Sequence, residues 1–163
     1  MYRSGIGYDA HRFGQGRKLV LGGVEIPHEH GLEGHSDADV LSHAIADALL
    51  GAIGERDIGH HFPNTDESIR GISSLEILRR VGAILAAKNW RVTNLDATLI
   101  AEAPRIGPHL EAMRGKIAAA LRIEMAQVGL KATTNEGMGA IGRGEGMAAM
   151  AVASVEGGGG VVE

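Results

Sequence analysis

The sequence predicts an α/β (α+β) fold in which helices pack on one face of a single mixed β-sheet. The chain has 163 residues, of which 44% are hydrophobic and 22% charged, and this suits one hydrophobic core. Segments of strand character alternate with three segments of helical periodicity, and no repeat or linker separates them. We therefore expect one domain over residues 1–156 and a flexible, glycine-rich tail at residues 157–163.

The first elements are strands. β-forming residues mixed with glycine predict a strand at residues 2–13. Residues 18–26 predict a short hairpin that turns at Gly22 and Gly23, and residues 27–34 then form a loop.

A helix from residue 36 to about residue 54 follows, with Ser36 and Asp37 as its N-cap signal. Residues 55–71 contain Gly, Pro, Asn and Asp without a sustained period, so we expect a long loop there. Loops of this length in compact domains are commonly functional.

The second half alternates helices with strands. Capping serines and a helical spacing of leucines predict a second helix at residues 75–89, and alternating apolar residues predict a strand at residues 90–100. A third helix opens at Gly107-Pro108 and runs to about residue 121. Closing strands are expected at residues 128–133 and 147–155, on either side of a glycine-rich turn.

Composition excludes several functional classes. The net charge of −4 and the small aromatic content (one Trp, two Tyr, two Phe) leave neither a cationic field nor a stacking surface for nucleic acid. The absence of cysteine excludes disulfides and thiolate metal sites. No apolar run approaches the roughly 18 residues of a membrane span, so we expect no membrane partner and a cytoplasmic location.

Carboxylates and histidines recur at spacings that suit a metal site. Asp9 and His11 lie two residues apart in the first expected strand, so both side chains project from one face. At about 100° per residue, Asp39, His43 and Asp47 form a ridge on the first helix, opposite its apolar side. If ridge and strand meet, Asp9, His11 and His43 supply three ligands and leave a fourth position open, as in catalytic zinc sites. The residues alone also allow a hydrogen-bonded pair at a sheet edge and an exposed polar stripe.

A second candidate site follows the strand at residues 128–133. Hydroxyls and a carboxylate in residues 133–136 precede a run of glycines, and such groups suit phosphate oxygens and a hard cation. The P-loop pattern is absent, and a glycine-rich hairpin without a ligand is the alternative. Arg143 and Glu145 fit either a salt bridge within the turn or a ligand contact.

Five ordered motifs resemble one enzyme family. They are GYDAHRF at residues 7–13, GHSDADV at 34–40 followed by His43, DIGHHFPNTD at 57–66, KATTNE at 131–136 and GRGEG at 142–146. Together they span nearly the whole chain and resemble the 2-C-methyl-D-erythritol 2,4-cyclodiphosphate synthase family. The resemblance implies a phosphorus–oxygen lyase of the non-mevalonate isoprenoid pathway. Such an enzyme converts 4-diphosphocytidyl-2-C-methyl-D-erythritol 2-phosphate to the cyclic diphosphate and CMP, as a homotrimer with active sites at subunit interfaces.

The resemblance also implies roles for residues at matching positions. Asp9, His11 and His43 would bind one Zn²⁺ ion, and Glu136 would bind a second divalent cation, Mg²⁺ or Mn²⁺. His35 and Thr134 would hold the reacting phosphates as the catalytic residues. The residues implied to hold the erythritol phosphate end are Asp57, Ile58, Gly59, Phe62, Pro63, Asn64, Thr65 and Asp66. Those implied to bind the cytidine diphosphate part from the adjacent chain are Ala101, Glu102, Ala103, Pro104, Arg105, Ile106, Gly107 and Thr133. The other implied substrate-binding residues are Ser36, Asn135, Ala140 and Arg143.

Two positions depart from the family pattern. Ala140 stands where many members have an aromatic residue, and Asn64 stands where many have Asp, which removes a ring at the first position and a charge at the second.

Two alternative functions remain open. One is a zinc-dependent phosphoester hydrolase with Asp39 or Asp47 as general base. The other is a non-enzymatic module that binds a nucleotide or an isoprenoid phosphate.

Overall fold

The structure is a computed structural model that describes residues 1–158. A five-stranded sheet has the strand order β4 (Gly31–Leu32), β1 (Tyr2–Gly14), β7 (Gly146–Gly157), β5 (Trp90–Ile100) and β6 (Val128–Thr133). β5 and β6 pair in parallel and the other neighbours are antiparallel, so the predicted mixed sheet is confirmed. The predicted hairpin forms a separate two-stranded sheet from β2 (Leu19–Leu21) and β3 (Val24–Ile26).

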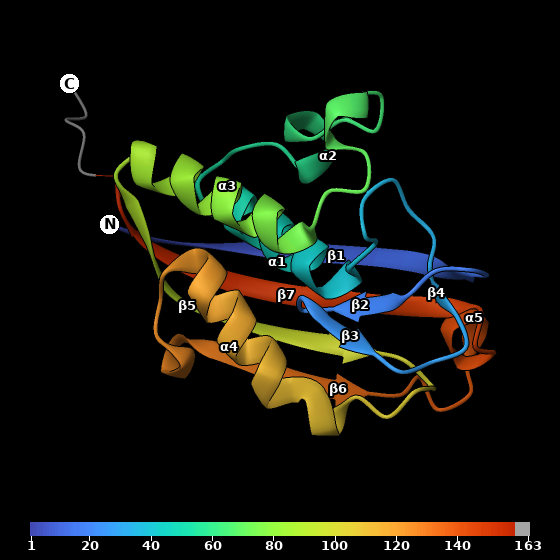
Figure 1. The fold of residues 1–163 in the computed structure, drawn as a ribbon. Helices are drawn as coiled ribbons and strands as arrows, with labels where there is room; N and C mark the ends of the chain where they lie inside the picture. The colour runs from blue at the N-terminus through green and yellow to red at the C-terminus, as the bar shows by residue number, and fades with distance from the viewer. Residues whose placement is uncertain (159–163) are drawn as a thin grey trace.

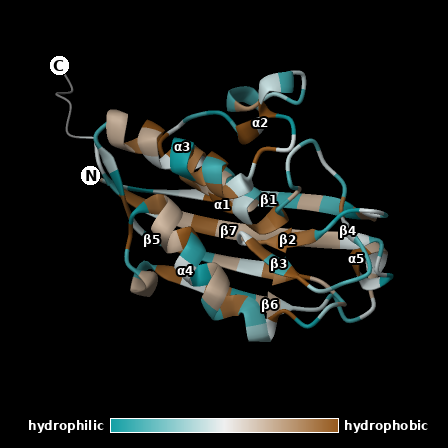
Figure 2. Cartoon of the chain, viewed as in Figure 1, coloured by the Kyte–Doolittle hydropathy of each residue, from teal (hydrophilic) through white to brown (hydrophobic). Residues whose placement is uncertain are grey.

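Three helices cover one face of the five-stranded sheet (Figure 1): α1 (Val40–Ala52), α3 (Ser74–Ala87) and α4 (Leu110–Leu121). α1 lies on β1 and β7, α3 packs against α1, and α4 packs against α3 and β6. α1 and β7 supply much of the buried core, and Figure 2 shows hydrophobic residues along β7. In the part of the chain that is described, no helix combines the length and the apolar character needed to cross a bilayer.

Short elements form outside the predicted helices and strands. They are β4 within residues 27–34, α2 (Ile58–His61) and a 3₁₀ turn (Glu67–Ile69) within residues 55–71, a 3₁₀ turn (Met125–Gln127) before β6, and α5 (Gly139–Gly142) in the glycine-rich turn. Each has four residues or fewer, which is too short to leave a periodic pattern in the sequence. The predicted third helix opens at Gly107 as expected, but its first three residues form a 3₁₀ turn (Gly107–His109) and α4 itself starts at Leu110. In the expected tail, Gly157 is the last residue of β7, and residues 159–163 lie outside the described residues.

The first long helix begins later than predicted. α1 starts at Val40, and its N-cap is Asp39, whose carboxylate accepts a backbone N–H from the first turn. Ser36 and Asp37, the predicted N-cap residues, each accept a backbone N–H two residues further on, in the turn before the helix. Asp39 also accepts the two N–H groups of the β2–β3 turn, so it joins that hairpin to the helix and fixes where the helix starts.

α1 is buried on nearly all sides, and only Asp47 and one glycine in it are not buried. The predicted exposed ridge is therefore wrong at Asp39, which is 0% exposed beneath the hairpin turn, and at His43, which is 6% exposed, while Asp47 is partly buried. On the sheet side, the backbones of β1 and α1 are in direct contact. A Cβ atom on Gly7 would lie 1.9 Å from the carbonyl oxygen of Ala44, so only glycine permits this approach.

Candidate active site

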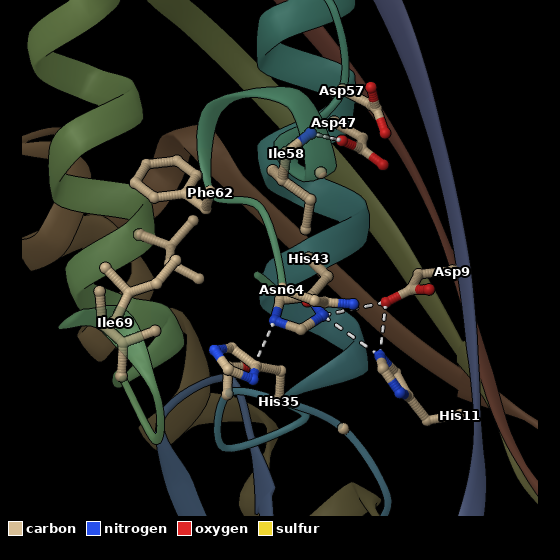
Figure 3. Close-up of a pocket in the computed structure, with 15 residues that line it drawn as sticks. Asp9, His11, His35, His43, Asp47, Asp57, Ile58, Phe62, Asn64 and Ile69 are labelled. Atoms are coloured by element: carbon tan, nitrogen blue, oxygen red, sulfur yellow. Dashed lines mark hydrogen bonds and ion pairs between the residues drawn. The ribbon is translucent and has the colours of Figure 1, made fainter. Parts of the chain in front are cut away.

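Asp9, His11 and His43 converge where β1 meets α1 (Figure 3). Asp9 and His11 lie on the α1-facing side of β1, because alternate residues of a strand share a face. His43 reaches them from the first turn of α1. The Oδ2 atom of Asp9 is 2.9 Å from His11 Nε2 and 3.0 Å from His43 Nδ1, and the two nitrogens are 3.2 Å apart. The convergence expected from the sequence is therefore present.

The chemistry of these donors fits a divalent cation. His11 Nδ1 lies 2.7 Å from the carbonyl oxygen of Glu33, which can only accept a hydrogen bond. In the neutral imidazole, Nδ1 therefore carries the hydrogen, and Nε2 directs its lone pair toward Asp9 and His43. Two nitrogen donors and one carboxylate oxygen suit zinc and its neighbours in the first transition row, and three protein ligands leave room for a further one.

The close contacts within this cluster shift the pKa values of Asp9 and His11. Burial pushes the pKa of Asp9 upward, but the close contacts with the His11 and His43 rings together outweigh burial and hold that pKa well below its ordinary value. Burial lowers the pKa of His11, but the Asp9 carboxylate raises it more strongly, so the pKa lies above 6.5. A cation that binds here must displace the proton that Asp9 favours on His11.

The cluster forms one side of a cavity of about 270 Å³. His35 and His43 line it together with Asp9 and His11, and Figure 3 shows Asn64, Phe62 and Ile58 around the same space. Six of the predicted substrate-binding residues line this cavity: Ser36, Asp57, Ile58, Gly59, Phe62 and Asn64.

Three further predicted residues of that loop lie outside the cavity lining. Pro63, Thr65 and Asp66 are exposed, and the Asp66 carboxylate accepts the Ser68 N–H at the start of the 3₁₀ turn. The Asp66 carbonyl oxygen is 3.3 Å from His35 Nε2, so the loop contacts His35 through its backbone.

The chain matches the model of the YgbB family over residues 2–156. The chain belongs to the YgbB family. It is 60% identical over 153 residues to the 2-C-methyl-D-erythritol 2,4-cyclodiphosphate synthase of Alkaliphilus metalliredigens, an alignment that covers 94% of this chain and 96% of that protein. The resemblance of the sequence motifs to that family is thereby confirmed.

Solved structures of related proteins have the same fold as this YgbB family member. The IspF protein of Plasmodium falciparum, in complex with CDP, superposes with a TM-score of 0.83 at 31% identity over 96% of each chain. The bifunctional IspDF of Campylobacter jejuni superposes with a TM-score of 0.93 at 37% identity. That alignment covers 96% of this chain but only 42% of the Campylobacter chain, so this chain spans less than half of the bifunctional protein.

In this YgbB family member, the predicted site that follows residues 128–133 lies at the β6 edge of the sheet, away from β1. Residues 101–107 follow β5 and residues 134–136 follow β6, whereas β1 is separated from β6 by β7 and β5. Three strand spacings amount to about 14 Å. Within one chain, Thr133, Thr134 and Glu136 are therefore not brought to the cavity beside Asp9.

These distant residues form a unit of their own. The Glu102 carboxylate accepts the backbone N–H of Asn135 at 2.9 Å and that of Gly137 at 3.3 Å, which joins residues 101–107 to the turn after β6. Glu136 between them is exposed and has a φ of 52°, in the left-handed region.

The remaining predicted residues lie near α5. Ala140 shares a shallow hollow with His11 and Arg12. Arg143 Nε donates to Glu145 Oε2 at 2.9 Å, so the salt bridge within the turn, one of the two alternatives for this pair, is present.

Sequence reasoning missed part of the cavity. Asp47 lines it, one helical turn beyond His43, and its Oδ1 accepts the Ile58 N–H at 2.8 Å. Partial burial raises the pKa of Asp47. Its spacing from His43 could have identified it as a cavity residue rather than only a possible base. Ile69, Ile72 and Ile77 also line the cavity, and nothing distinguishes such isoleucines from core residues in the sequence.

Proposed function

We propose that this chain is a phosphorus–oxygen lyase of the non-mevalonate isoprenoid pathway. Its reaction converts 4-diphosphocytidyl-2-C-methyl-D-erythritol 2-phosphate to 2-C-methyl-D-erythritol 2,4-cyclodiphosphate and CMP. The observation that carries this proposal is the convergence of Asp9, His11 and His43 beside a cavity, in a chain of this family. CDP in the complex of the Plasmodium relative supports a cytidine diphosphate substrate. The cytoplasmic location stays a prediction.

Charge explains why such a reaction needs cations here. The chain has a net charge of −4, and the described residues that line the cavity include neither Lys nor Arg. Asp9, His11 and His43 would hold one zinc ion, and Glu136 would hold a second cation, magnesium or manganese. When bound, these cations neutralise phosphate charge and polarise phosphorus–oxygen bonds.

The chain's own residues orient the substrate. Asp57, Asn64 and the backbone near Gly59 offer hydrogen-bonding groups for the erythritol phosphate end, while Phe62 and the isoleucines exclude water. His35 lies beside the Asp9 cluster and would hold the reacting phosphate, together with Thr134 from a neighbouring chain.

The chemical step is an internal phosphoryl transfer. An oxygen of the 2-phosphate forms a bond to the β-phosphorus, and the bond from that phosphorus to the bridging oxygen breaks, so that CMP leaves. No side-chain nucleophile takes part. Because both phosphates belong to one molecule, orientation by the cavity can supply up to about 7–11 kcal/mol of the rate enhancement.

We further propose a homotrimer whose active sites lie at the subunit interfaces. The residues that the family resemblance assigns to cytidine diphosphate follow β5 or end β6, two or three strand spacings (about 10–14 Å) from β1 in one chain, so a neighbour would complete the site. The sheet face that points away from α1 also carries exposed apolar side chains, which contacts between copies of this chain would bury. These side chains are Ile6, Tyr8, Met150 and Val152.

Product analysis tests the reaction. ³¹P NMR and chromatography of a reaction with the purified, metal-loaded protein should show one CMP released for each cyclic diphosphate formed. Release of inorganic phosphate or a linear diphosphate would instead identify a hydrolase. Asp47 would then be the base, because Asp39 is buried and fully hydrogen-bonded. Substrate that is bound but not consumed would identify a binding module.

Mixing two inactive variants tests the shared site. Asp9→Ala and Glu136→Gln should each be inactive alone. If each site takes Asp9 from one chain and Glu136 from the next, co-refolded mixed trimers should regain about a quarter of wild-type activity. A mixture that stays as inactive as its components would contradict the shared site.

A further inference from the structure

We propose that Ser74 and Asp37 are positioning residues that fix the tautomer and orientation of His43, so that its Nδ1 lone pair points at the metal site. This inference rests on the metal site of the proposed function, but it does not depend on the substrate. It concerns the ring nitrogen on the far side of His43 from Asp9.

The His43 ring is held at both nitrogens. Nδ1 faces Asp9 at 3.0 Å, while Nε2 lies 2.8 Å from the hydroxyl oxygen of Ser74. The Ser74 hydroxyl in turn donates to Asp37 Oδ1, and the Ser74 backbone N–H donates to Asp37 Oδ2 at 3.0 Å. Ser74 is 0% exposed and His43 is 6% exposed, so bulk water does not compete for these bonds.

The direction of these hydrogen bonds follows from counting hydrogens. The Asp37 carboxylate already accepts the backbone N–H groups of Asp39 and Ser74, so it acts as an acceptor toward the Ser74 hydroxyl as well. A hydroxyl has one hydrogen, and the Ser74 hydroxyl donates that hydrogen to Asp37. The Ser74 oxygen can therefore only accept from His43, which in the neutral imidazole that binds a metal places the ring hydrogen on Nε2 and leaves the lone pair on Nδ1.

Ser36 fits the same assignment. Its hydroxyl oxygen is 3.1 Å from His43 Nε2 and accepts the Ala38 N–H. Because Nε2 carries a hydrogen, Ser36 cannot donate to it. The hydroxyl hydrogen of Ser36 is then free to point into the cavity, which Ser36 lines. The two serines therefore have different tasks, since Ser74 orients the histidine and Ser36 can meet a ligand.

The same contacts tie the metal site to a helix. Ser74 is the first residue of α3, and the N-cap residue Ser73 makes no side-chain capping bond. Asp37 supplies that bond instead, through the Ser74 N–H. Removing either partner therefore risks a loss of stability as well as a loss of positioning, and the test must separate the two effects.

Ser42 provides a matched control for Ser74. Both serines are buried, at 1% and 0% exposure, and each hydroxyl donates to an aspartate carboxylate that caps a helix. The Ser42 hydroxyl, however, bonds to Asp39 and not to His43. Ser74→Ala and Ser42→Ala thus remove similar hydrogen bonds, but only Ser74→Ala removes the support of a proposed ligand.

The experiment measures zinc affinity of metal-free protein by competition with a chromogenic chelator, with thermal unfolding measured in parallel. Loss of an outer hydrogen-bond partner of a metal-binding histidine weakens affinity about 10–100-fold. We expect that loss for Ser74→Ala, recovery for Ser74→Thr, which keeps the hydroxyl, and a change of less than about threefold for Ser42→Ala. Unchanged affinity in Ser74→Ala, or an equal loss in Ser42→Ala, would overturn the inference.

The tautomer itself is observable by ¹⁵N NMR of His43. In the zinc-loaded wild type, Nε2 should carry the hydrogen and Nδ1 should show the shift of a metal-bound nitrogen. In Asp37→Asn, the amide can donate to Ser74, so the Ser74 hydroxyl turns toward His43 and the population with hydrogen on Nδ1 should rise in metal-free protein. A hydrogen on Nδ1 in the zinc-loaded wild type would overturn the inference. If the wild type binds no zinc at all, the proposed metal site fails rather than its positioning.

Discussion

Replacing Gly7 with alanine should separate β1 from α1 and disrupt the candidate metal site without touching any of its ligands. Gly7 lies two residues before Asp9 on the α1-facing side of β1. Its added Cβ would lie 1.9 Å from the carbonyl oxygen of Ala44 and 2.8 Å from the backbone nitrogen of Ala48. Both are backbone atoms, so no side-chain rotation relieves the contact.

The size of the effect follows from these distances. Real Cβ atoms stay at least 3.0 Å from such neighbours, so β1 and α1 must move apart locally by about 1 Å. Metal–ligand distances tolerate only about 0.2 Å, and the ligands come from both elements. Overpacking costs about 1–3 kcal/mol, and we expect the upper end here because neither backbone can yield cheaply. Zinc affinity should fall by more than about tenfold, which corresponds to about 1.4 kcal/mol.

Urea unfolding and zinc competition measure the two effects, and Gly82→Ala is the control. Gly82 lies within α3, and a Cβ there would first meet Leu121 Cδ2 at 3.8 Å, an ordinary contact. That variant should bind zinc normally and be up to about 1 kcal/mol more stable, because alanine favours a helix over glycine. Wild-type stability and wild-type zinc affinity in Gly7→Ala would refute the claim that this close packing sets the site geometry.

Two further predictions concern a buried carboxylate and pH. Asp39→Ala should lower the free energy of unfolding by about 2–4 kcal/mol, because it removes the α1 cap and leaves the N–H groups of the hairpin turn without an acceptor. Urea titration measures this loss, and Asp96→Ala, at an exposed position, is the control. A loss no larger than that of Asp96→Ala would contradict the role of Asp39 in joining the hairpin to α1. In metal-free protein, the lowered pKa of Asp9 stabilises the fold above pH 3.8, and this stability is lost as the pH falls through the pKa that Asp9 has in the folded protein. The raised pKa of His11 stabilises the fold below pH 6.5, and this stability is lost as the pH rises through the pKa that His11 has in the folded protein. Zinc competes with the His11 proton, so the rise in Tm caused by zinc should be larger at about pH 8 than at about pH 6; an equal rise at both would argue against His11 as a ligand.

The parts of the site that follow a regular period could be predicted from the sequence. Asp9 and His11 share a face because a strand repeats every two residues, and His43 projects from the helix that packs on that face. The motifs then indicated which carboxylates and imidazoles belong together. The mixed sheet followed in the same way from alternating strand and helix patterns.

Features that depend on tertiary contacts could not be predicted. Asp39 has the spacing of an exposed ridge residue, yet it is buried because its carboxylate bonds to a turn 16 and 17 residues earlier in the chain. The contact between Ser74 and His43 joins positions 31 residues apart, and neither residue type nor spacing signals it. The separation of Glu136 from Asp9 is likewise a property of strand order, which the sequence pattern does not specify.

Anomalous diffraction at the zinc edge, from crystals of the zinc-loaded protein, locates the bound ion. One strong peak is expected within bonding distance of Asp9 Oδ2, His11 Nε2 and His43 Nδ1, on the side that faces the cavity. Zinc bound elsewhere, or a peak that reaches His43 only through Nε2, would contradict this ligand assignment.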